Sequence, residues 1–134
     1  MSLMPSLDPE EEILIHCPVA YKLRSPLGIT PVEKACYLTE SRLIIEKECD
    51  YAYIPYAYLT GLNLVGSHDA EKVIKLEHGK KIRFAVHGKE SLHIRNQKTE
   101  KLYNWLHDLC NSPDKKSSVL RDIKAARRQF EPRD

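Results

Sequence analysis

The residues best suited to chemistry in this chain are its cysteines and histidines. There are six histidines and four cysteines, the latter being Cys17, Cys36, Cys49 and Cys110. No two cysteines form a C-x-x-C pair, and the only adjacent His and Cys are His16 and Cys17. A zinc site needs about four clustered ligands, and adjacent residues on a strand point to opposite faces. The pattern therefore predicts buried, inert thiols, with no metal and no cofactor.

The acidic and glycine-containing segments do not indicate an enzyme either. The carboxylates of Glu10–Glu12 and of Glu46 and Glu48 are typical of surface charge rather than of an acid–base pair. The chain has only 5 glycines among 134 residues, which leaves little scope for a glycine-rich phosphate loop. No apolar run is long enough to span a membrane. We expect a non-catalytic, cytoplasmic protein without an export leader, whose thiols stay reduced.

Charge is distributed unevenly along the chain. The total of 21 basic and 19 acidic residues gives +2, but residues 1–50 carry nine acidic and five basic residues, hence −4. Residues 72–101 carry nine basic and three acidic residues, hence +6. Such a basic side attracts phosphates, acidic proteins or anionic lipid. The candidate ligand-binding residues are Lys80, Lys81, Arg83 and Lys89, although solvated strand faces and hairpin tips are the simpler interpretation.

Hydrophobic patterning predicts a series of strands with short connections. A helical turn is expected to begin at Asp8, where Pro9 and three glutamates suit a helix start. The predicted strands cover 13–24, 34–39, 42–47, 51–54, 59–65, a hairpin around residues 74–86, and 91–95, with a loop at 25–31. Short connections favour antiparallel neighbours.

The hydrophobic pattern of residues 74–86 determines which face of this hairpin is buried. Ile74, Leu76 and Phe84 share the buried face only if the loop has an odd number of residues. A three-residue loop at 79–81 pairs Leu76 with Phe84 and places Glu77 opposite Arg83.

One amphipathic helix follows the strands. Asn96 is expected to cap a helix over residues 97–110, whose apolar stripe is Leu102, Trp105, Leu106 and Leu109. A helix with a single apolar stripe must close a sheet or barrel. We expect Trp105 to be buried against strand residues such as Leu43 or Phe84.

A basic tail, residues 112–134, follows the predicted domain of residues 1–111. Residues 114–130 are expected to form a second amphipathic helix. Its apolar side is Val119, Leu120, Ile123 and Phe130, and its basic side is Arg121, Lys124, Arg127 and Arg128. This stripe could lie on the outer sheet, bind another chain or meet a membrane. We favour another copy of this protein, and expect that exchanging Leu120 and Ile123 for aspartate would reduce the oligomer but leave the barrel folded.

Two motifs resemble a known family. Residues 37–44, YLTESRLI, resemble the L-T-x-x-R-L-I hairpin of bacterial pleckstrin-homology-like and GRAM-like domains, and residues 54–62, IPYAYLTGL, are similar to the I-P-x-x-x-I segment that follows it. The order of the motifs and the final helix agree over residues 10–111. The resemblance implies a mainly β fold, a partly open antiparallel barrel of about seven strands capped by one C-terminal helix. It also implies a non-catalytic binding or scaffolding module and homo-oligomers.

The chain departs from the phosphoinositide-binding members of that family. Lys22 and Arg24 stand on the first predicted strand, but Glu40 occupies the place of a required base. We therefore expect no specific inositol-phosphate site. Binding to an anionic membrane is expected to be non-specific and to fade as salt rises.

Two classes of function remain open at this point. The first is a module for protein–protein interaction or self-assembly. One form of this hypothesis has the module act at an anionic membrane surface. The alternative is a nucleic-acid-binding module that uses the basic second half, the basic tail and Tyr51, Tyr53, Tyr56 and Tyr58, because basic residues interleaved with aromatics grip phosphates and stack bases.

Overall fold

The computed structural model describes residues 4–66 and 70–131, without the side chains of residues 22–25, 29 and 30. Within this part the chain is mainly β and confirms the predicted architecture. The elements in chain order are β1 (Ile13–Ser25), β2 (Gly28–Thr39), β3 (Arg42–Glu46), β4 (Tyr51–Pro55), the 3-10 turn η1 (Tyr56–Tyr58), β5 (Thr60–Val65), β6 (Val73–His78), β7 (Lys80–Val86), α1 (Leu92–Asn111), the 3-10 turn η2 (Pro113–Lys115) and α2 (Lys116–Phe130).

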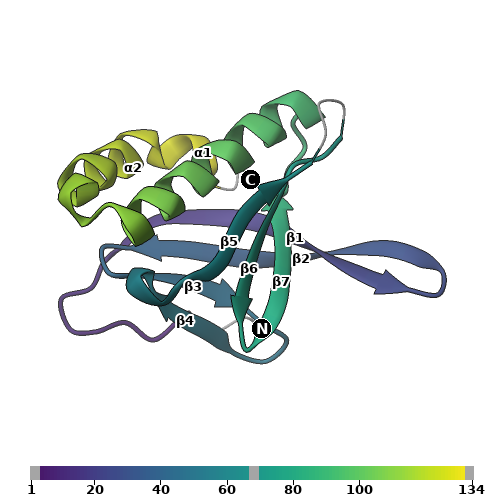
Figure 1. The fold of residues 1–134 in the computed structure, drawn as a ribbon, viewed down its shortest axis with the longest axis horizontal. Helices are drawn as coiled ribbons and strands as arrows, with labels where there is room; N and C mark the ends of the chain where they lie inside the picture. The colour runs from purple at the N-terminus through teal and green to yellow at the C-terminus, as the bar shows by residue number, and fades with distance from the viewer. Residues whose placement is uncertain (1–3, 67–69, 132–134) are drawn as a thin grey trace.

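The seven strands form one open antiparallel sheet in the order β4-β3-β2-β1-β7-β6-β5. β1 joins the two halves of this sheet, because Val19–Tyr21 pair with Phe84–Val86 of β7. The strands β5–β7 cross those of β1–β4 steeply, and both helices lie over the same side of the sheet (Figure 1). β4 and β5 are the edge strands, so the sheet does not close.

The hairpin of β1 and β2 is longer than the sequence predicts. The expected loop at 25–31 is wrong: the strands pair from Ile13 with Thr39 out to Ser25 with Gly28. Figure 1 shows this hairpin extending beyond the rest of the sheet. Pro31 is tolerated because this end of β2 has no third strand beside it; β3 pairs only with Cys36–Leu38. A proline without an N–H donor is accepted at such an edge.

The β6–β7 hairpin has the predicted faces but a shifted register. Ile74 lies opposite Phe84 and Leu76 opposite Ile82, two residues away from the predicted pairing. The turn is tighter than expected because Gly79 adopts φ +74°, a conformation that residues with a side chain rarely adopt. The shift places Lys75, instead of Glu77, opposite Arg83.

Helix α1 begins five residues earlier than predicted. The strand expected at residues 91–95 is wrong, because the Ser91 hydroxyl accepts a hydrogen bond from the Ile94 N–H at 3.3 Å and caps the helix. Asn96, the predicted cap, holds the loop before β6: its amide accepts from Lys72 N–H at 2.8 Å and donates to the Ala70 carbonyl at 3.0 Å. The apolar stripe of α1 is buried in the core as predicted, Trp105 being 5% exposed.

The tail helix is present as α2, and its apolar side packs within the same chain. Val119, Ile123, Ala126 and Phe130 are buried in the core cluster that also contains Trp105. α2 contacts β1 and α1, and the rings of Phe130 and Trp105 lie 5.2 Å apart. The helix thus covers β1 beside α1, as Figure 1 shows.

The segment before β1 forms a single turn at Asp8, where the Glu11 N–H donates to the Asp8 carbonyl at 3.0 Å, but it does not continue as a helix. The side chain of Glu11 reaches β3. The carboxylate of Glu11 accepts hydrogen bonds from Arg42 Nε at 2.8 Å and from an Arg42 terminal nitrogen at 2.6 Å. It also accepts from the Thr39 hydroxyl at 2.7 Å. The same terminal nitrogen of Arg42 also donates a hydrogen bond to the Ser6 carbonyl, at 2.9 Å. These bonds tie the N-terminal segment to the start of β3.

Candidate functional site

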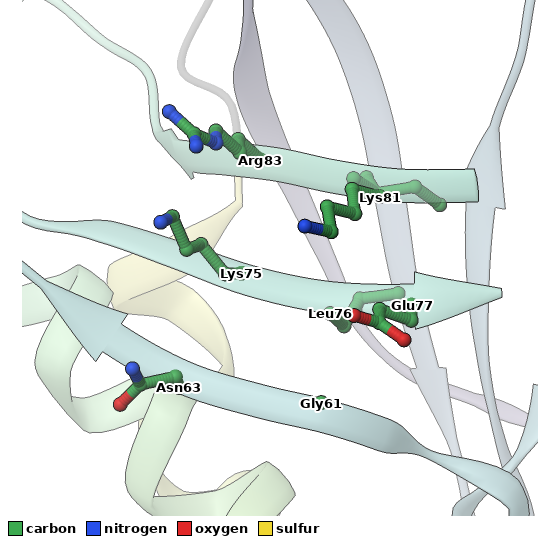
Figure 2. A pocket seen from close by; sticks show the side chains of 8 residues that line it. Gly61, Asn63, Lys75, Leu76, Glu77, Lys81 and Arg83 are labelled. Carbon is green, nitrogen blue, oxygen red and sulfur yellow. The ribbon is translucent and has the colours of Figure 1, made fainter.

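A shallow hollow on the outer face of β5–β7 brings together cations from neighbouring strands. Lys75 comes from β6, Lys81 and Arg83 come from β7, and Asn63 lies on β5 (Figure 2). Residues two apart on a strand share a face, so the alternation that buries Ile74 and Phe84 turns these side chains outward. Lys81, Arg83 and Asn63 are exposed, while Lys75 is half-buried.

Two of these cations lie directly opposite one another. The pairing of β6 and β7 sets Lys75 against Arg83, and β5 sets Asn63 against Lys75. Like charges directly opposite on a sheet are destabilising. Within residues 4–66 and 70–131, Lys75, Lys81 and Arg83 make no salt bridge to a carboxylate. The hollow therefore carries net positive charge, with three cations against the single carboxylate of Glu77.

The one acidic side chain in the hollow is turned toward β5. Glu77 lies opposite Lys81 in the register, yet the two form no ion pair in the described structure. A Cβ added at Gly61 would lie 2.9 Å from Glu77 Cγ, so the Glu77 side chain occupies the space above this glycine. Gly61 has φ +63° and sits where the pairing of β5 with β6 is irregular. The bulge thus accommodates Glu77 on the side of β5.

Two of the four predicted ligand-binding residues belong to this hollow. Lys81 and Arg83 line it. Lys80 pairs with His78 at the hairpin tip, on the alternate side of β7. Lys89 follows the other end of β7, which spans about 20 Å, so the four residues do not form one patch. Lys75 and Asn63 were not predicted as ligand-binding residues. The correct hairpin register would have placed Lys75 opposite Arg83 and so identified it.

The predicted partner-binding residues of the tail divide between core and solvent. Val119, Ile123 and Phe130 are buried within the chain, and Leu120 is half-buried. A contact with a partner through the buried residues would require α2 to leave β1. Ile123 is fully buried, so an aspartate there would put a charge in the core. The basic residues Arg121, Lys124, Arg127 and Arg128 are exposed, and Arg127 binds Glu131 at 2.9 Å.

The four tyrosines near β4 occupy different environments. Tyr51 and Tyr53 continue a row of rings on the outer face of β1–β4, where Tyr37 stacks on His16 at 4.6 Å. Tyr56 is buried and donates to the Thr39 carbonyl at 2.6 Å. Tyr58 is 70% exposed on η1. The tyrosines therefore do not alternate with the cations of β6 and β7.

The expected burial of the cysteines is confirmed for Cys17 and Cys36 but is wrong for Cys49, which is exposed, while Cys110 is half-buried. Cys17 and Cys36 are opposite one another on β1 and β2 and are both buried. Burial raises the pKa of Cys17 to about 12, which keeps it as the unreactive thiol. Among residues 4–66 and 70–131, no three His, Cys, Asp or Glu side chains gather in a way that could hold a metal ion. None of the helices in those ranges has the length and hydrophobicity to cross a membrane.

Comparison with known proteins does not add a function. The chain matches no model of a protein family, and no curated protein matches its sequence. The pleckstrin-homology-like assignment therefore remains a prediction from the two motifs. The side chains of Lys22 and Arg24, on which the phosphoinositide comparison depends, lie outside the described residues.

Proposed function

We propose that the chain is a non-catalytic binding module that mediates protein–protein interaction or self-assembly through the outer face of β5–β7. The observation that carries the proposal is the opposition of Lys75 and Arg83, neither of which forms a salt bridge in the described structure. A sheet that keeps like charges together loses stability. An anionic partner would offset this cost, because it would lie between the two cations.

The partner that this chain can itself supply is its own acidic half. Exposed carboxylates in that half lie before β1, at the turn after β2 and at the turn after β3; they are Asp8, Glu10, Glu12, Glu40, Glu48 and Asp50. The basic face and these carboxylates belong to different regions of the sheet. One copy can therefore present its acidic turns to the basic face of the next, in a head-to-tail contact. Complementary charge favours encounter and fixes orientation.

The separation of tyrosines and cations argues for a protein partner rather than nucleic acid. Non-specific single-strand binders combine a basic groove with stacked aromatic side chains. Here Tyr51 and Tyr53 lie with β1–β4, whereas Lys75 and Arg83 lie with β6 and β7. We therefore favour a protein partner over the alternative of a nucleic-acid-binding module.

Charge reversal tests this proposal. Lys75→Glu combined with Arg83→Glu should weaken self-association at low salt by about tenfold or more, because charged pairs set register and encounter rate. Sedimentation velocity over a salt series measures this effect. The matched control is Lys115→Glu with Lys116→Glu, which changes two exposed lysines at the start of α2 by the same charge.

A second variant tests the orientation. Glu48→Lys with Asp50→Lys should also weaken association, and a mixture with the Lys75/Arg83 double variant should restore it. A wild-type chain that stays monomeric at every salt concentration would refute self-assembly. Equal losses in the control and in the Lys75/Arg83 variant would refute the assignment to β5–β7.

A further inference from the structure

We infer that the hollow between Lys75, Lys81 and Arg83 is a binding site for a phosphate group. The inference rests on the proposed function, because it uses the same basic face, and it adds phosphate as an anion that would compete there with the carboxylates of another copy. It places the site on the outside of the sheet, away from the side that α1 and α2 cover (Figures 1 and 2).

The donors in the hollow suit a compact anion with several oxygens. Arg83 presents paired N–H groups that can bind two oxygens of a phosphate, whereas lysines act as point charges. Lys75 lies directly across from Arg83, and Lys81 is two residues from Arg83 on the same face of β7. The side-chain amide of Asn63, opposite Lys75 on β5, adds a neutral hydrogen-bond donor. Three cations and an amide thus line one hollow.

The local backbone keeps the competing carboxylate on one side of this hollow. Glu77 would be the natural partner of Lys81 across the strands, and such a pair would neutralise one of the three cations. Gly61 leaves room for Glu77 to lie over β5, where a Cβ would come within 2.9 Å of its Cγ. In Figure 2 the Glu77 carboxylate lies at the side of Gly61, and the Lys75 and Arg83 nitrogens lie toward the other end of the hollow.

The size of the hollow selects a small group. Its volume is about 190 Å³, below the roughly 300–1,000 Å³ of sites that enclose drug-sized ligands. A phosphate fits this space, whereas a whole nucleotide would extend far outside it. The phosphate can come from a free phosphate or from the headgroup of a phospholipid, since both present the same oxygens.

The first experiment titrates the full chain with inorganic phosphate and monitors it by ¹H–¹⁵N NMR. A titration with sodium chloride at equal ionic strength serves as the reference. We expect saturable shifts at the amides of Asn63, Lys75 and Arg83. Lys75→Gln with Arg83→Gln should weaken binding by about tenfold or more, since both charge-assisted contacts are lost. Lys115→Gln with Lys116→Gln should leave it unchanged.

A variant that binds phosphate more tightly distinguishes a specific site from a general charge effect and from damage to the fold, because a damaged fold would weaken binding. Glu77→Gln should strengthen phosphate binding by about two- to fivefold, because it removes a negative charge near the hollow. Asp122→Asn removes one negative charge from the exposed side of α2 and should have no effect. Failure of Glu77→Gln to strengthen binding would contradict the geometry described here.

Vesicles distinguish the two sources of the phosphate. Phosphatidylcholine vesicles with and without phosphatidic acid are compared by co-sedimentation. Binding of free phosphate at the hollow indicates a soluble ligand, and binding to phosphatidic acid vesicles alone, abolished by the Lys75/Arg83 variant, indicates a headgroup. If neither probe binds, or if polyglutamate displaces phosphate at lower charge concentration, the phosphate site is refuted. Salt-sensitive self-association could persist in that case, which separates this inference from the proposed function.

Discussion

Replacing Trp105 by alanine is expected to lower the free energy of unfolding by about 3–5 kcal/mol, the usual cost of deleting a large buried aromatic side chain. Trp105 is 5% exposed and belongs to the core cluster that the strands, α1 and α2 share. Denaturation in urea, followed by far-ultraviolet circular dichroism, measures the loss. Tyr58→Ala is the control, because Tyr58 is 70% exposed and its removal should change stability by less than about 0.5 kcal/mol.

The same experiment tests how α2 is anchored. The rings of Trp105 and Phe130 lie 5.2 Å apart, so the effects of Trp105→Ala and Phe130→Ala should not add. A double-mutant cycle should give a coupling of about 0.5–1.5 kcal/mol, as for other aromatic pairs. Strictly additive effects would show that α2 does not pack on α1 as described.

Glu11→Gln is expected to lower the free energy of unfolding by about 2–4 kcal/mol at neutral pH, since it leaves the Arg42 guanidinium without its charged partner. The Glu11 side chain is 4% exposed and that of Arg42 18%, so water cannot replace the lost contacts freely. Arg42 also lies over the Tyr53 ring at 4.6 Å. Glu12→Gln, at the exposed neighbouring residue, is the control and should be nearly neutral.

The same carboxylate makes stability depend on pH. Hydrogen bonds from Arg42, followed by that from Thr39, lower the pKa of Glu11 from 4.5 to about 2. A group whose pKa is lower in the folded state stabilises the fold fully above its ordinary pKa, and this contribution is lost as pH falls toward the folded value. Wild type should therefore lose more stability than Glu11→Gln between pH 4.5 and 2. Parallel pH profiles for the two proteins would contradict this role of Glu11.

Local patterns predicted the strands and the helix stripe because each depends on neighbouring residues. The apolar run Leu43, Ile44 and Ile45 in β3 is buried as expected. The stripe residues Leu102, Trp105 and Leu106 of α1 are buried as well. The start of α1 was missed because Leu92 and Ile94 alternate with polar residues as a strand does. In the structure they are 37% and 43% exposed on a helix capped by Ser91.

The candidate site was only half predictable, since it depends on register. Lys81 and Arg83 were found from the density of charge, whereas Lys75 joins them only because Gly79 tightens the hairpin by two residues. The Glu11–Arg42 contact joins residues 31 apart, and no local pattern marks such a pair. The apolar stripe of α2 was visible in the sequence, but its burial on β1 depends on the space that α1 leaves open.

The claim that β5–β7 carries the binding surface is tested most directly by mapping the self-contact residue by residue. ¹H–¹⁵N spectra of the wild-type chain at low salt, recorded from dilute to concentrated solution, report which amides change their surroundings. We predict that the changes concentrate at Asn63, Lys75 and Arg83, with a second group at Glu48 and Asp50, and that added salt reverses them. Changes confined to α2 or to the row of rings at Tyr37 and Tyr51, with β6 and β7 unaffected, would contradict the account.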